Sequence, residues 1–128
     1  MATRVPPLPF TALVLDAASK ALLLAFVPPR HSRVFVDHVT LEHNPGAPVT
    51  SEFRAACRVV ESFEDSVGQA VRVELDLNAS ALFKGQRSHI TLSCGPETLP
   101  EHSNAIKGGS PLPFALVLFG TVKTVVPK

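Results

Sequence analysis

The sequence predicts an α+β domain, with an α/β arrangement as the alternative, in which helices lie outside a sheet. Segments typical of strands outnumber the two apparent helices, and those helices follow different strands along the chain. The 128 residues fit one domain spanning residues 1–128. With 45% apolar and 18% charged residues, the composition is that of a globular and not a disordered chain.

The chain begins with an expected strand followed by a helix. Residues 10–15 are an apolar run typical of a buried strand. Asp16 is suited to cap a helix over residues 17–26, which are rich in helix formers. Pro28 and Pro29 should end that helix, because proline cannot continue it.

A second strand and a second helix are expected next. Residues 34–43 have the composition of a strand and run into a turn at 44–46. Thr50 or Ser51 could cap a helix that continues to about Phe63. That expectation depends on four residues spaced roughly one helical turn apart, which are Phe53, Cys57, Val60 and Glu61.

The second half of the chain should be mostly strands. Residues 71–77 alternate apolar and charged side chains, which predicts a half-buried strand with one solvated face. Further strands are expected over residues 79–83, 88–94 and 114–126, the last either straight or bent at Gly120. Residues 100–109 are expected as a loop or a short helix.

A repeated tetrapeptide is the most informative feature of the sequence. His-Val-Thr-Leu at residues 38–41 recurs as His-Ile-Thr-Leu at residues 89–92. Because alternate side chains on a strand share a face, the His and Thr of each copy should project to one side and the apolar pair to the other. Two such strands side by side would present four polar side chains to one point, namely His38, Thr40, His89 and Thr91. Two imidazoles and two hydroxyls can bind and cleave a phosphodiester without a metal.

These motifs resemble those of the 2H phosphoesterase superfamily. The likeness is greatest to the cyclic phosphodiesterase domain of fungal and plant tRNA ligases, whose first motif is similar to His-Val-Thr-Leu-x-His at residues 38–43. The second motif is similar to His-Ile-Thr at 89–91 with Ser-Asn at 103–104. Residues 11–16 also resemble the first strand of that domain, and the short spacing between motifs suggests a compact member.

The resemblance implies a fold and a reaction. The fold would be two β-rich lobes, mostly antiparallel sheets around a central cleft with outer helices. The reaction would be metal-independent hydrolysis of a 2′,3′-cyclic phosphate that leaves a 2′-phosphate, with His38 as acid and His89 as base. Thr40 and Thr91 would donate hydrogen bonds to the phosphoryl oxygens. The residues alone leave open the regiochemistry and which histidine is the acid.

Four more residues are candidates for contact with the substrate. His43 ends the first motif, although on a regular strand it would face away from His38. Lys84 and Arg87 flank the second motif and could meet a phosphate or a base, with a solvated turn as the alternative. Asn104 could bind the nucleotide or close a turn. The two other histidines, His31 and His102, are expected at the surface.

Charge and composition limit the partners. A net charge of +1 argues against binding to long nucleic acid, so the expected partner is a 2′,3′-cyclic nucleotide or an RNA 3′ end. No cofactor is expected. A metal site is not expected either, since Cys-x-x-Cys is absent and the spacing of His38 and His43 is not that of a zinc protease. We expect a monomer.

Cysteine content and hydropathy bear on the compartment. Cys57 and Cys94 are expected to be reduced, packed thiols, because two cysteines do not make a disulfide framework in a chain of this size. The apolar stretch 10–27 is interrupted by Asp16 and Lys20, which argues against a membrane span or a signal peptide. The expected compartment is the cytoplasm or the nucleus.

Two other functions remain open from the sequence. An enzyme of the same superfamily could trim RNA ends or cleave 2′–5′ linkages, and it would act on oligonucleotides that lack a cyclic phosphate. A module of a different class could bind nucleotides without turnover, and its binding would not require both histidines.

Overall fold

The computed structural model describes residues 9–43, 51–84 and 87–125. Its strands are β1 (Phe10–Leu15), β2 (Arg33–Val34), β3 (His38–His43), β4 (Phe53–Glu64), β5 (Gly68–Leu75), β6 (His89–Cys94) and β7 (Ser110–Val125). Its helices are α1 (Ala17–Phe26), α2 (Leu77–Ser80) and the 3₁₀ helix η1 (Pro100–Ala105).

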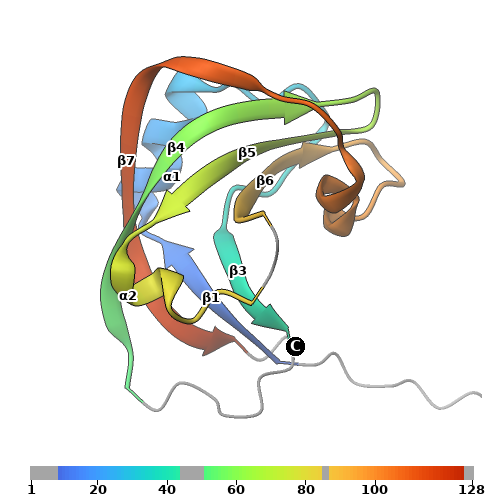
Figure 1. Ribbon diagram of the computed structural model, residues 1–128. Helices are drawn as coiled ribbons and strands as arrows, with labels where there is room; N and C mark the ends of the chain where they lie inside the picture. The colour runs from blue at the N-terminus through green and yellow to red at the C-terminus, as the bar shows by residue number, and fades with distance from the viewer. Residues whose placement is uncertain (1–8, 44–50, 85–86, 126–128) are drawn as a thin grey trace, which may run out of the picture.

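The strands form one closed antiparallel barrel. The sheet order is β2-β6-β3-β1-β7-β4-β5, and a further pairing of β5 with β6 closes the ring (Figure 1). One edge of β6 pairs with β5. The opposite edge of β6 pairs with β3 near its start and with β2 near its end. This mostly-sheet architecture with attached helices agrees with the α+β prediction. The expected two separate lobes are not confirmed, because the described strands are hydrogen-bonded into a single ring.

The hydrophobic core lies inside the barrel and is made of alternating side chains of its strands. The buried set includes Leu13, Val39, Ile90, Leu92, Leu118 and Val122, each with no exposed surface. Leu23 of α1 joins the same core, and α1 packs against β7. Each such side chain contributes about 1.5–3 kcal/mol by leaving water. No helix among the described residues is long and apolar enough to cross a lipid bilayer.

The first strand and helix confirm the prediction, with one difference at the cap. Asp16 is the N-cap residue of α1, yet its side chain makes no capping hydrogen bond. The carboxylate instead accepts hydrogen bonds from the guanidinium of Arg54 on β4. This ion pair ties the start of α1 to the barrel, and the Arg54 hydrogen bond lowers the pKa of Asp16 despite the opposing effect of desolvation.

The helix expected over residues 51–63 is wrong. Residues 53–64 form β4, in which the buried side chains Ala55, Cys57 and Val59 alternate with more exposed ones. A β-bulge at Val60 inserts one extra residue opposite β5 and reverses the faces of the strand beyond it. Phe63 therefore lies across from Ala70 and packs with it and Ile106 in a separate cluster outside the barrel core. Phe53 and Cys57 are four residues apart, a spacing that puts both side chains on one face of a strand as well as of a helix, and this explains the misleading pattern.

The strand expected over residues 79–83 is also wrong. The Asp76 carboxylate accepts hydrogen bonds from the backbone N–H groups of Ala79 and Ala56. The first of these caps the short helix α2, and the second fixes that helix to β4. An aspartate that serves both elements therefore ends β5 and begins a helical turn.

The strand expected over residues 34–43 is interrupted. It divides into β2 and β3 at Val36, whose φ of 35° is the single positive φ of a non-glycine residue among those described. Val36 is buried, and its N–H still donates to the carbonyl of Thr91. A β-branched residue is strained at such a φ, so packing and this hydrogen bond hold the break immediately before the first motif.

The other strands expected in the second half are present, although the one expected over residues 71–77 is β5, which starts at Gly68 and ends at Leu75. The second motif lies on β6, and residues 100–105 form a short helix of the 3₁₀ type. β7 runs through Gly120 as one strand. A Cβ at Gly120 would collide with the carbonyl of Val14, so glycine at this position permits the close approach of β1 and β7.

Both thiols should be unreactive in the native protein. Cys57 and Cys94 are buried and are not joined in a disulfide, as predicted. Burial raises the pKa of the Cys57 thiol to about 12, so almost no thiolate exists at neutral pH. Ellman's reagent should react at least about 100-fold more slowly with the native protein than with the protein in urea. A rapid stoichiometric reaction of either thiol without denaturant would contradict this burial.

Candidate active site

The strand register brings the two repeated motifs together. β3 pairs with β6 in antiparallel fashion, and Val39 lies directly opposite Ile90. Both of these side chains are fully buried in the barrel. The neighbouring positions then face outward, with His38 across from Thr91 and Thr40 across from His89. All four polar side chains expected to act together therefore share one face of two adjoining strands.

The two histidines lie on a diagonal of this face. Diagonal cross-strand neighbours are separated by about 7–8 Å, with the side chains somewhat closer. The two threonines occupy the other corners of the same quadrilateral. The four side chains are each half-buried, so the face is shielded in part from water yet open to a ligand.

His89 is held in one tautomer. Its Nδ1 lies 3.0 Å from the carbonyl oxygen of Arg87, and since a carbonyl can only accept, Nδ1 must carry the hydrogen. Its ring also meets the edge of Phe63, with 6.5 Å between the ring centroids. Burial lowers the pKa of His89, and the positive charges of Arg87 and His38 lower it further. The hydrogen bond to the Arg87 carbonyl acts to raise this pKa but does not outweigh them. The ring is therefore neutral near pH 7, with its lone pair on Nε2.

His38 has a different kind of partner. Its Nδ1 lies 3.0 Å from a carboxylate oxygen of Asp37, and its ring packs against Phe10 with 5.0 Å between centroids. Asp37 also accepts a hydrogen bond of 2.9 Å from Lys20 of α1. Desolvation acts to raise the pKa of Asp37, but the hydrogen bonds from Lys20 and His38 outweigh it and lower that pKa. Asp37 is thus an anion that orients His38 and leaves its Nε2 for a ligand.

The break at Val36 explains why adjacent residues can form this pair. On a regular strand, the side chains of Asp37 and His38 would point to opposite faces. The unusual backbone at Val36 turns the chain before β3 begins, and Leu15 donates its N–H to the carbonyl of Asp37. Sequence reasoning missed Asp37 because its contact depends on this local break.

Thr91 is oriented by a residue of the 3₁₀ helix. Its Oγ1 lies 2.8 Å from Oγ of Ser103, which is buried. On the neighbouring strand β5, the residue opposite Thr91 is Ala70. The small side chain of Ala70 leaves room for η1 to pack over β5. Ser103 belongs to the Ser-Asn pair noted in the sequence, where only its neighbour Asn104 was considered for binding. Its own signal was a small hydroxyl residue a dozen positions after the second motif.

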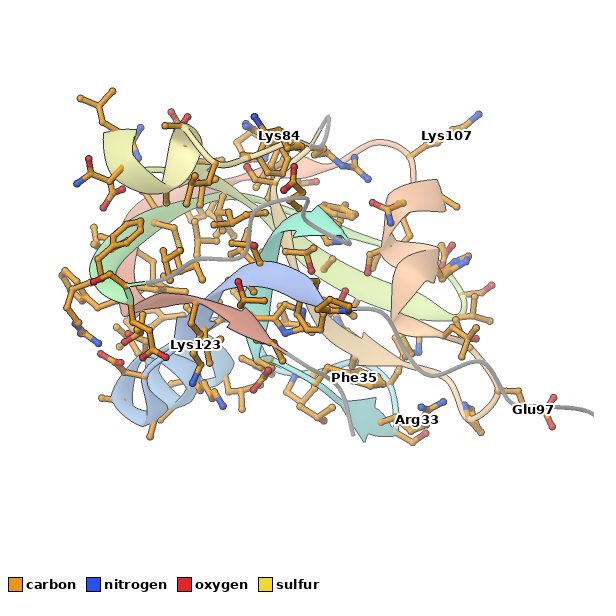
Figure 2. The ribbon with its side chains drawn as sticks, turned by 90° about the horizontal axis from the view of Figure 1, so that it is seen from below. Arg33, Phe35, Lys84, Glu97, Lys107 and Lys123 are labelled. Carbon is orange, nitrogen blue, oxygen red and sulfur yellow. The ribbon has the colours of Figure 1, made fainter. Side chains whose placement is uncertain are left out.

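The other candidates lie around this face in different ways. Asn104 is exposed on η1. Lys84, which is labelled in Figure 2, is also exposed, and its backbone N–H donates to the carbonyl of Leu41. Arg87 is half-buried, and its guanidinium is engaged by backbone carbonyls. His43 is paired through its backbone with Phe10, but its side chain lies outside the described part of the structure.

The described residues were also compared with the requirements of a metal site and of a ligand cavity. Within residues 9–43, 51–84 and 87–125, no group of three or more His, Cys, Asp or Glu side chains is arranged to hold a metal ion. A cavity of about 660 Å³ lies between the end of α1 and strands β4 and β7, and none of the four motif residues lines it. Phe63 lines this cavity and contacts His89, so its ring lies between the two places.

Comparison with known proteins indicates a fold. No protein-family model matches the chain, and no curated protein matches it in sequence. Among solved structures, the crystal structure of a fungal RNA kinase is similar, with a TM-score of 0.61 and 16% sequence identity. The match covers 96% of this chain and 46% of the kinase chain, so this chain spans under half of the neighbour's length. At that identity, the likeness shows a shared fold alone.

Proposed function

We propose that this chain is a metal-independent phosphodiesterase that hydrolyses 2′,3′-cyclic phosphates on nucleotides or RNA 3′ ends. The observation that carries the proposal is the pairing of Val39 with Ile90, which sets two imidazoles and two hydroxyls on one face. Such a set supplies a general base, a general acid and two hydrogen-bond donors around one phosphorus.

The hydrogen-bond partners favour His89 as the base. Its Nδ1 donates to a neutral carbonyl, and burial keeps the ring neutral, so the Nε2 lone pair can take a proton from water. The Asp37 carboxylate accepts the Nδ1 hydrogen of His38, which leaves Nε2 as the nitrogen that can deliver a proton to the leaving oxygen. Water oxygen then bonds to phosphorus, the bond from phosphorus to the ribose 3′ oxygen breaks, and His38 protonates that oxygen. The product is a 2′-phosphate.

The two threonines stabilise the charge that builds during this step. Thr40 and Thr91 flank the diagonal between the histidines, where the non-bridging phosphoryl oxygens would lie. The contact between Thr91 and Ser103 holds the Thr91 side chain in place before substrate binds. Donors fixed in advance need no rearrangement as the phosphoryl oxygens gain charge.

The fold comparison supports an enzyme that acts on RNA. The similar structure is described as an RNA kinase, and a barrel shared with such a protein suits chemistry at RNA ends. With a net charge of +1, this chain is better matched to a terminal nucleotide than to a long phosphate backbone.

Turnover of each 2′,3′-cyclic mononucleotide in the presence of EDTA tests the proposal. The expected result is hydrolysis that EDTA does not inhibit, with the 2′-phosphate as the product separated by chromatography. Loss of activity in EDTA that a divalent ion restores would replace the mechanism. Cleavage restricted to oligonucleotides without a cyclic phosphate would indicate RNA end trimming or 2′–5′ hydrolysis instead. Binding of 2′-nucleotides without turnover would indicate a binding module.

The pH dependence of kcat/KM should report both histidines. Because His89 must be neutral to act as base, activity should fall as pH drops through its pKa, which burial holds below the ordinary 6.5. The low-pH limb should therefore have its midpoint below 6.5, and a second limb should appear at higher pH as the acid loses its proton. A low-pH midpoint above 6.5 would exclude His89 as the base.

A further inference from the structure

Arg87 makes an unusual set of contacts for a residue beside the second motif. Its guanidinium donates to the carbonyl of Ile106 at 2.7 Å and to the carbonyl of Ser103 at 3.2 Å. It also stacks over the ring of Phe63, with 4.0 Å from the guanidinium carbon to the ring centroid. These contacts satisfy carbonyls at the end of η1, where no further helical turn supplies donors.

The same residue contacts the second motif through its backbone. The Arg87 carbonyl accepts the Nδ1 hydrogen of His89 at 3.0 Å, and the Phe63 ring beneath the guanidinium meets the edge of His89. Ser103, one of the residues that Arg87 holds, contacts Thr91 at 2.8 Å. One arginine is therefore connected to both functional side chains of β6.

The neighbourhood of η1 is built for this close packing. η1 lies beside β5 and β6, at the right of Figure 1. A Cβ at Gly68 would come within 2.9 Å of His102 and 3.3 Å of Ile106, so glycine there lets η1 approach β5. His102 also lies 2.6 Å from the Asp65 carboxylate in the turn between β4 and β5. η1 is thus fixed in its middle by the pair of His102 with Asp65 and at its C-terminal end by Arg87.

We propose that Arg87 is a positioning residue that sets His89 and Thr91 for the reaction, through the Phe63 ring and the η1 helix, and does not itself contact the substrate. The inference rests on the proposed phosphodiesterase function. It differs from the expectation that Arg87 binds phosphate, because Nη2 donates to two backbone carbonyls and one face of the guanidinium covers the Phe63 ring, so these contacts direct the group into the protein.

The test compares Arg87→Met with Arg87→Lys. Arg87→Met keeps an apolar stem over Phe63 but loses the forked donor and the charge, and we expect kcat to fall about 10–100-fold with KM changed less than about twofold. Arg87→Lys keeps the charge and should recover part of kcat. Arg58→Met is the matched control, since Arg58 pairs with Glu74 on the exposed side of β4, and its loss should leave kcat unchanged.

A second readout does not depend on activity. The NMR titration of the His89 ring should move to higher pH in Arg87→Met, because a nearby positive charge is removed and the ring becomes more accessible to water. Arg87→Lys should stay near the native midpoint. If the native protein proves inactive, the proposed function fails, but this titration still tests the positioning role.

Three outcomes would overturn the inference. A raised KM with unchanged kcat in Arg87→Met would mean that Arg87 binds the substrate. An unchanged His89 titration with a lowered melting temperature would mean a structural role alone. If Arg87→Met does not fold, Ser103→Ala takes its place, since it keeps the arginine contacts and removes the hydroxyl beside Thr91. Native kcat in Ser103→Ala would then contradict the route through η1.

Discussion

Replacement of His89 by alanine is expected to lower kcat on 2′,3′-cyclic nucleotides by about 10²–10⁴, and His38→Ala should have an effect of the same order. Each substitution removes one proton-transfer partner and leaves the barrel in place, because both side chains lie on its outer face. The double variant should be little slower than either single variant, since acid and base act in one concerted step and their effects are not additive. Steady-state kinetics on purified variants provide the measurement.

A histidine outside the site provides the control for this prediction. His31 precedes β2, and its N–H donates to Ser93, so a His31→Ala variant keeps that backbone contact. It should retain native kcat. Far-ultraviolet circular dichroism and melting temperature should match among the native protein and its four variants. Near-native turnover in either His38→Ala or His89→Ala, with the fold intact, would show that the assigned acid and base are wrong.

Replacement of Thr91 or Thr40 by valine is expected to lower kcat by about 10²–10³, the loss typical of one donor to a developing oxyanion. Valine keeps the shape of threonine and removes only the hydroxyl, so the strand pairing of β3 with β6 should persist. KM should change less than kcat, because the hydrogen bond strengthens as charge develops on the phosphoryl oxygens.

Serine variants distinguish a lost hydroxyl from a packing change. Thr91→Ser and Thr40→Ser keep the donor and lose the methyl group, and each should retain most of the native kcat. For Thr91, the serine hydroxyl can still meet Ser103, the partner found in the native protein. An equal loss of kcat in the serine and valine variants would assign the effect to packing and remove the threonines from the mechanism.

The motif strands were predictable because their pattern is local. In residues 38–41 and 89–92, polar and apolar side chains alternate, and alternation alone tells which side chains share a face. The structure adds that these two strands are neighbours, through Val39 and Ile90. No local pattern indicates which strands pair, so the meeting of the motifs was a hypothesis from their repetition.

The missed features depend on irregular backbone or on distant contacts. The bulge at Val60 interrupts the alternation of buried and exposed side chains, so no strand period is visible over the whole length of β4. The positive φ at Val36 brings Asp37 to His38, against the alternation of a regular strand. The closure of β5 on β6, which makes one barrel where two lobes were expected, arises from hydrogen bonds between segments about twenty residues apart.

The most direct test of the central claim is a binding titration followed at the histidine rings. With ¹³C-labelled histidine, a 2′-nucleotide should shift the ring signals of both His38 and His89 along one binding curve with one Kd. The His31 and His102 signals should stay in place, because neither ring belongs to the face shared by β3 and β6. Shifts of only one motif histidine, or two curves with different Kd values, would show that the four side chains do not converge on one phosphate.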